Sequence, residues 1–243
     1  MAGTSAASFY TGLVADLYKP LKSTSFDSLQ YRDLIAQYGE PALELGCGDG
    51  DPLLDLRESG IDVDGLDSSP DMIARLHRRA ETRNLEVTAW VASMESMNPS
   101  RQYATVFLAG PTLNLLPTDD AMRQTLHRIK RALLPNGTAI VPLFVPAPPS
   151  ADYIGSVTRR DTASGWIACR VLSVERDEGA RTQITALRYE RERNGMLQQL
   201  KRNWLLHWID VDGFTALAEE AGLRTIDAPA ALDHEPRNTV LRS

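Results

Sequence analysis

The chain has 243 residues, of which 43% are hydrophobic and 24% charged, a composition typical of a globular α/β domain. Its formal net charge of −6 argues against a nucleic-acid groove, which needs a basic field. Two cysteines, Cys47 and Cys169, are too few for a disulfide framework and fit a reducing compartment. No apolar run approaches the ~18 residues of a membrane helix, and no export pattern opens the chain, so we expect a cytoplasmic protein.

Strand and helix patterns alternate along the first two thirds of the chain. Residues 7–38 predict two helical segments, the second from Phe26 to Tyr38. The strands expected next are Pro41–Gly46, Ile61–Asp67, Leu85–Ala92, Tyr103–Ala109 and a fifth from Thr138; the helices between them are Pro52–Glu58, Pro70 to about Arg83, and Thr118 to Leu133. This alternation predicts a doubly wound parallel sheet. Pro142 lacks a ladder donor, so we expect pairing of the fifth strand to end at Val141.

The pattern changes after the proline-rich segment 146–149. Residues 153–208 carry strand-like runs separated by turn sequences at 161–165, 177–179 and 194–195, and the last of these, Asn194-Gly195, is a strong hairpin signal. We therefore expect about four antiparallel strands inserted after the fifth strand. A helix over Asp210–Gly222 and two short strands, Arg224–Ala228 and Asn238–Leu241, complete a seven-stranded sheet.

Three glycines at alternate positions, Gly46, Gly48 and Gly50, follow the first strand. Glycine tolerates positive φ and lets a ligand approach the backbone. A dinucleotide site would want a third glycine at position 51, where this chain has Asp51. Asp67 ends the second strand, and a carboxylate there can accept two hydrogen bonds from ribose hydroxyls, although alone it could equally cap a turn. The pattern favours a nucleoside-containing ligand other than a dinucleotide.

These residues resemble the class I S-adenosylmethionine-dependent methyltransferases over 41–144. Glu44 and the three glycines resemble motif I of that family, Asp67 its ribose-binding acid, and 91–94 the segment that lines the adenine. The family usually has aspartate where this chain has Ser93. The resemblance implies that the donor, S-adenosylmethionine, contacts Tyr10, Tyr18, Glu44, Gly46, Cys47, Gly48, Gly50, Asp67, Ser68, Ser93, Met94 and Ala109.

The same resemblance implies three parts: a helical lid over 1–40, a donor-binding core over 41–149 and 209–243, and an antiparallel cap over 150–208 that covers the acceptor. Tyr10 or Tyr18 would stack near the sulfonium, whose positive charge a ring face attracts, although both rings could instead pack the core. Asn114, in the motif after the fourth strand, is a candidate near the reacting centre. His207 is the candidate general base if the cap turns it toward the acceptor; an ordinary strand histidine is the competing interpretation.

The aromatic residues of the insertion favour a small organic acceptor, as in bacterial methyltransferases of secondary metabolism, including those that act on amines. Since no base is compelling, we expect an amine nitrogen as acceptor. An O-methyltransferase that uses His207, or a regulatory protein that binds the donor without turnover, remains the alternative. We expect no metal, no nucleic acid and no membrane as partners, and a monomer or homodimer.

Overall fold

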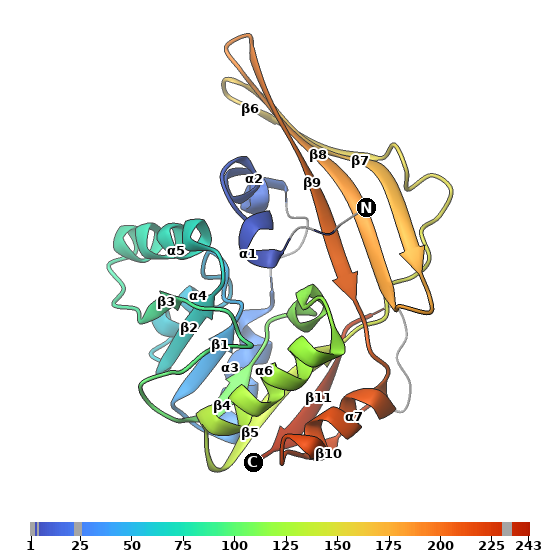
Figure 1. Ribbon diagram of the computed structural model, residues 1–243. Helices are drawn as coiled ribbons and strands as arrows, with labels where there is room; N and C mark the ends of the chain where they lie inside the picture. The colour runs from blue at the N-terminus through green and yellow to red at the C-terminus, as the bar shows by residue number, and fades with distance from the viewer. Residues whose placement is uncertain (1–2, 4, 22–25, 230–234) are drawn as a thin grey trace.

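Seven strands form one mixed sheet in the computed structural model, which describes residues 3, 5–21, 26–229 and 235–243 (Figure 1). They are β1 (Ala42–Leu45), β2 (Val63–Asp67), β3 (Ala89–Val91), β4 (Tyr103–Phe107), β5 (Leu133–Leu143), β10 (Arg224–Asp227) and β11 (Arg237–Arg242). Their order is β10-β11-β5-β4-β1-β2-β3, with β11 antiparallel to β5 and to β10 and the other pairs parallel. The doubly wound sheet expected from the sequence is thereby confirmed.

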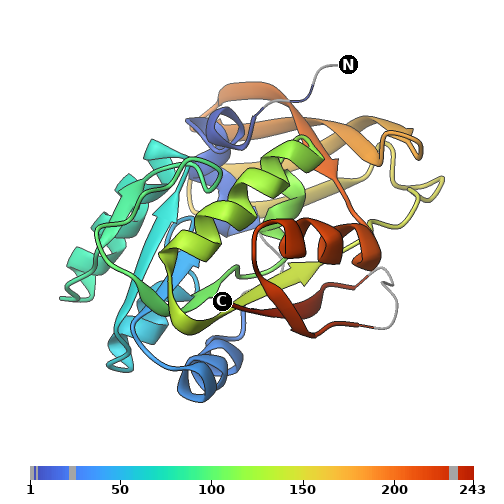
Figure 2. The ribbon, with the colours of Figure 1, turned by 60° about the horizontal axis from the view of Figure 1, so that its bottom comes forward.

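Helices cover both faces of this sheet. They are α3 (Ser28–Tyr38), α4 (Leu53–Glu58), α5 (Pro70–Thr82), α6 (Asp119–Ala132) and α7 (Val211–Glu220). One core cluster joins α6 and α7 to the sheet, and a second cluster joins α3, α4 and α5 to the opposite face (Figure 2). Side-chain caps fix where two of these helices begin. The hydroxyls of Ser69 and Thr118 accept the backbone N–H of Met72 and Ala121, at the starts of α5 and α6.

Three local predictions differ from the structure. The third strand is shorter than expected, only Ala89–Val91, because the residues before it run outside the ladder. Pairing of β5 does not end at Val141: it ends at Ile140 toward β4 but continues through Pro142 to Leu143 toward β11. Proline fits there because one side of the strand has no neighbour at that point.

The segment before α3 also differs, since it holds two short helices, α1 (Ala6–Phe9) and α2 (Leu13–Leu21), where one was expected. Gly12, with φ of 54°, separates them. None of the helices among the described residues is long and apolar enough to cross a membrane.

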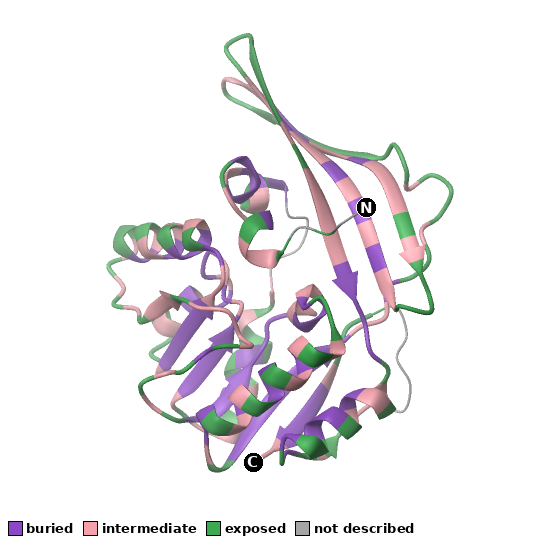
Figure 3. Ribbon diagram, viewed as in Figure 1, coloured by how far each residue is buried: buried purple, intermediate pink, exposed green. Residues whose placement is uncertain are grey.

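A second, four-stranded antiparallel sheet stands over the first (Figure 1). It consists of β6 (Val157–Thr162), β7 (Gly165–Asp177), β8 (Thr182–Arg193) and β9 (Met196–His207), as the turn sequences predicted. The inner part of the sheet packs on α1 and α2 through Phe9 and Val14, whereas the far hairpins extend into solvent (Figure 3). The helices α1 and α2 therefore lie between the insertion and the rest of the molecule.

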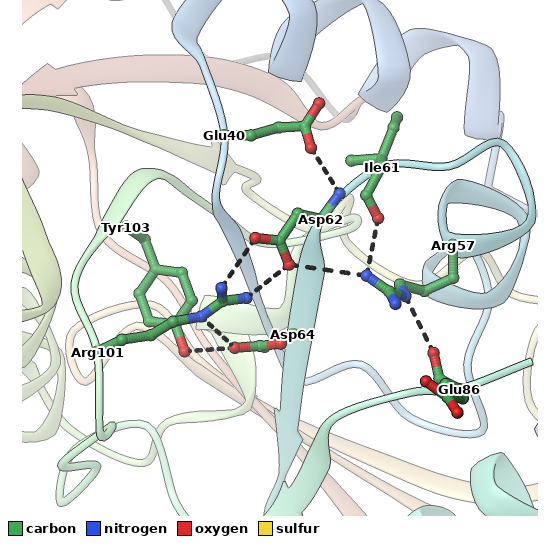
Figure 4. Close-up of polar contacts among 8 residues, drawn as sticks. All are labelled: Glu40, Arg57, Ile61, Asp62, Asp64, Glu86, Arg101 and Tyr103. Atoms are coloured by element: carbon green, nitrogen blue, oxygen red, sulfur yellow. Dashed lines mark hydrogen bonds and ion pairs between the residues drawn. The ribbon is translucent and has the colours of Figure 1, made fainter.

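An ionic network holds the amino-terminal edge of the main sheet (Figure 4). The guanidinium of Arg101 donates two hydrogen bonds of 2.8 Å to Asp62 and one of 2.8 Å to the buried Asp64. The hydroxyl of Tyr103 donates to the same Asp64 at 2.9 Å. Hydrogen bonding to Arg101 lowers the pKa of Asp62 below its ordinary value. This network belongs to the scaffold, because ligands of such sheets bind at the opposite, carboxyl edge.

Candidate active site

A cavity of about 440 Å³ opens at the carboxyl ends of β1 and β2. Its wall includes the turn after β1, the end of β2, the segments after β3 and β4, and parts of α1, α2 and β9. Ten of the residues expected to contact the donor line it: Tyr10, Tyr18, Gly46, Cys47, Gly48, Asp67, Ser68, Ser93, Met94 and Ala109. The fold thus brings together residues that lie far apart in the sequence.

The glycine turn is built to leave its backbone bare. The N–H groups of Gly46 and Cys47 both donate to the carbonyl of Leu66, at 2.8 and 3.0 Å, which fixes the turn against β2. Gly46 has φ of 74°, and a Cβ there would lie 2.5 Å from Cγ2 of Thr112. Only glycine fits at this position, and the main chain therefore forms the cavity wall.

Asp67 is held by the same turn. Its Oδ2 accepts the N–H of Gly48 at 2.9 Å, and its Oδ1 accepts the N–H of Ser69 at 2.8 Å. Burial raises the pKa of Asp67, an effect that these two hydrogen bonds oppose. Each oxygen keeps a lone pair for a further donor, so the carboxylate can accept two hydroxyls side by side.

The chain matches a known family at these residues. The methyltransferase domain model matches residues 42–137, which span β1 to the start of β5. A curated relative, the dTDP-3-amino-3,6-dideoxy-alpha-D-glucopyranose N,N-dimethyltransferase of Streptomyces fradiae, is 26% identical over 72% of this chain and 69% of its own length. Residues 42–137 therefore form a class I methyltransferase domain.

Solved structures share the whole fold of this methyltransferase. The CcbJ methyltransferase of Streptomyces caelestis superposes with a TM-score of 0.77 at 21% identity, over 97% of this chain and 98% of that one. The sugar N-methyltransferase KedS8 of Streptoalloteichus gives a TM-score of 0.76 at 17% identity, over 100% and 97%. In contrast, matches to three curated sequences span only 43%, 69% and 49% of those proteins. The similarity in fold therefore extends over a larger share of the compared proteins than the similarity in sequence.

Two residues expected to contact the donor lie outside the cavity wall of the methyltransferase. Glu44 is completely buried in β1, behind the turn, and contributes to raising the pKa of the Cys47 thiol, after the larger effect of burial. Gly50 faces α4, where a Cβ would lie 2.7 Å from Cγ of Leu54. Neither residue is part of the described cavity wall.

The segment after β3 forms another side of the cavity. Ala92, Ser93, Met94 and Glu95 line it, and the hydroxyl of Ser93 lies 2.7 Å from the hydroxyl of Ser96. The sequence did not single out Met72 of α5, which also lines the wall. Its position two residues after the N1 proline of α5, shortly after Asp67, is the signal that could have found it.

Tyr10 and Tyr18, from the N-terminal part of the chain, line one side of the cavity. The rings of Tyr10 and Tyr18 meet edge to face, with centroids 5.6 Å apart and planes at 89°. Burial raises the pKa of Tyr10 to about 12, and burial likewise raises the pKa of Tyr18, so both hydroxyls are neutral. The hydroxyl of Ser69 donates to the carbonyl of Tyr10 at 2.6 Å, which ties the end of α1 to the start of α5.

Asp16 of α2 joins three parts of the methyltransferase. It forms ion pairs with Arg75 of α5 and, at 2.9 Å, with Arg191 of β8. The side chains are between 28% and 35% exposed, so solvent screens these pairs only in part. Asp16 therefore links α2 to both α5 and the insertion, and no sequence pattern pointed to it.

The structure corrects the two catalytic candidates outside the lid. Asn114, in the 3₁₀ helix η1 (Thr112–Leu115), is buried and uses both amide protons, donating to the carbonyls of Phe144 at 2.9 Å and His207 at 3.0 Å. The ring of His207 turns to Asp119, with Nε2 3.2 Å from Oδ1, and burial lowers its pKa. Neither lines the cavity, because β9 ends in packing against η1 and α6. Both side chains clamp the insertion to the core.

Proposed function

We propose that this methyltransferase transfers the methyl group of S-adenosylmethionine to an amine nitrogen of a small molecule. The observation that carries the proposal is one cavity that joins the bare glycine turn and Asp67 to β9 of the insertion. A donor on the turn and an acceptor under the insertion would share an enclosed space. Enclosure of both reactants supports catalysis by proximity.

We assign each group of the donor to a part of this wall. Asp67 would accept the two ribose hydroxyls, and the backbone at Gly46 to Gly48 would face the methionine portion. Met72 and Met94 offer apolar surface to the adenine, and Ser93 a hydrogen-bonding hydroxyl. The rings of Tyr10 and Tyr18 would lie on the side of the sulfonium, whose charge their faces attract.

Transfer itself is a displacement at carbon. The lone pair of the amine nitrogen forms the new N–C bond while the S–C bond breaks and its electron pair stays on sulfur. The sulfonium becomes a neutral thioether, and the methylated ammonium releases a proton to water. An amine that arrives unprotonated is already nucleophilic, so alignment is the main contribution of the protein.

The lining favours nitrogen over oxygen as the acceptor. None of the described residues of the cavity wall is histidine or lysine, and His207, the candidate base for a hydroxyl, lies outside it. A hydroxyl acceptor usually needs a base. The names of the Streptomyces fradiae relative and of KedS8 describe N-methylation. An amine nitrogen is accordingly the acceptor that we propose.

We further propose that the chain has the three parts expected from the sequence: a lid over 1–40, a donor-binding core over 41–149 and 209–243, and a cap over 150–208. Packing of Phe9 and Val14 on the insertion and the pairing of Asp16 with Arg75 and Arg191 support it. In this arrangement the lid would close the donor pocket and touch the cap at the same time.

Two measurements test the function. Isothermal titration with S-adenosylmethionine and S-adenosylhomocysteine asks whether the cavity holds the donor. Methyl-labelled donor, incubated with a panel of amines and matched alcohols, asks for transfer and for the acceptor atom. Binding without transfer to any acceptor would favour the regulatory alternative, and transfer to alcohols alone would replace nitrogen with oxygen.

A further inference from the structure

We infer that the acceptor is an amine on an apolar scaffold without phosphate groups, bound where β9 meets η1 and the end of β5. This inference rests on the proposed function and narrows it. It separates this chain from the Streptomyces fradiae relative, whose name gives an acceptor linked to a nucleoside diphosphate.

The charge of the cavity is the first observation. Its described lining contains four carboxylates, Asp49, Asp51, Asp67 and Glu95, and neither arginine, lysine nor histidine. Asp49 has a counter-ion outside the wall, since its Oδ2 lies 3.1 Å from the guanidinium of Arg79. A cavity lined by one sign of charge attracts the opposite sign, so this one favours cations and disfavours anions.

The apolar end of the cavity is the second observation. Leu115, Leu116 and Pro117 at η1 and Phe144 after β5 form one side of it. Trp204, Leu205 and Leu206 of β9 form the other. These residues belong to η1, the end of β5 and β9 and not to the glycine turn or β2, and the acceptor would fill this part of the cavity once the donor occupies the turn. An apolar surface of this kind binds an apolar scaffold, with the amine directed toward the acidic end.

Among the described residues of this wall there is no arginine or lysine that could bind a diphosphate. Phosphates in proteins are bound by arginine, lysine or the N-terminus of a regular helix. Arg202 of β9 lies two residues before Trp204, but its guanidinium donates to the carbonyl of Lys201 at 3.2 Å and does not line the cavity. Desolvating a diphosphate against carboxylates and leucines would therefore be unfavourable.

A matched pair of acceptors tests the inference. The probes are 3-amino-3,6-dideoxyglucose as its phenyl glycoside and as its dTDP ester, each with labelled donor. We expect kcat/KM to be at least about tenfold higher for the phenyl glycoside, since it lacks the repelled charges. Equal or better transfer to the dTDP ester would overturn the inference, and so would transfer to neither compound while the donor binds. Failure of the donor to bind would instead overturn the proposed function.

A pair of variants adds a test within the protein. Leu205→Lys places a cation in the wall and should raise kcat/KM for the dTDP ester relative to the phenyl glycoside by about tenfold. Leu205→Met keeps the wall apolar and should keep the wild-type preference. Both should bind S-adenosylhomocysteine as the wild type does, because Leu205 belongs to β9 and not to the glycine turn or β2. An unchanged preference in Leu205→Lys would contradict the role assigned to the charge of the wall.

Discussion

Replacing Asp67 by asparagine perturbs the donor site at its most constrained residue. In the structure each carboxylate oxygen already accepts one backbone N–H, from Gly48 at 2.9 Å and Ser69 at 2.8 Å. Asparagine has one acceptor oxygen, so its NH₂ group would face one of these N–H donors or the ribose. The substitution therefore removes a ribose contact and one anchor of the turn without changing the size of the side chain.

The loss can be estimated from these contacts. A hydrogen bond to a charged acceptor contributes about 1.5–3 kcal/mol. Two ribose hydroxyls would gain roughly 3–6 kcal/mol, and we take the lower part of that range, about 3–4 kcal/mol, because asparagine retains one acceptor. Since about 1.4 kcal/mol is a factor of ten in Kd, donor affinity should fall roughly 100- to 1,000-fold.

Calorimetry with S-adenosylhomocysteine measures this loss without turnover. Ser93→Ala is the matched control, since it removes a hydroxyl from the same wall and should weaken binding by less than about tenfold, the effect of one neutral hydrogen bond. Thermal unfolding of both variants shows whether the fold is retained. A folded Asp67→Asn protein that binds the product as tightly as Ser93→Ala would refute the assignment of Asp67 to the ribose.

Three further substitutions test the lid, the clamp and the scaffold. Asp16→Asn removes the carboxylate that links the lid to core and insertion, and calorimetry should show donor affinity lowered by roughly threefold to tenfold, with faster hydrogen exchange in α1 and α2; unchanged exchange would contradict the link. Asn114→Leu leaves two carbonyls without their donor and should lower the free energy of unfolding by about 2–4 kcal/mol in a urea titration; a loss below ~0.5 kcal/mol would contradict the clamp. Arg101→Ala removes the partner that lowers the pKa of Asp62. The stability from that shift is present above the ordinary aspartate pKa near ~3.9 and is lost as pH falls through the folded-state pKa, so the variant should lose less stability than wild type between about pH 5 and pH 3; parallel acid curves would contradict this.

The sequence predicted the sheet, and the placement of the glycine turn and Asp67 at one edge of it, because those features are local. The glycine turn and Asp67 follow consecutive strands, and parallel strands bring their carboxyl ends to one edge. The hairpins of the insertion were likewise readable from turn residues such as Asn194-Gly195. Pro142 misled the prediction because which side of a strand lacks a neighbour depends on β11, which pairs with β5 from far along the chain.

The remaining site residues depend on contacts that no local pattern encodes. Strand alternation predicts which residues of β9 share a face, but it does not predict which of them line the cavity. His207 was therefore a candidate base from the sequence, whereas in the structure its ring faces Asp119. Asn114 is polar, as a site residue would be, but its side-chain amide donates both protons to backbone carbonyls. Asp16 finds its arginines on two distant elements, one of them in the insertion.

A crystal structure of the protein soaked with S-adenosylhomocysteine tests the central claim most directly. We predict that both ribose hydroxyls lie within hydrogen-bonding distance of Asp67 and that the homocysteine chain runs along the backbone from Gly46 to Gly48. The product bound elsewhere, or bound in the cavity with its ribose away from Asp67, would contradict the account.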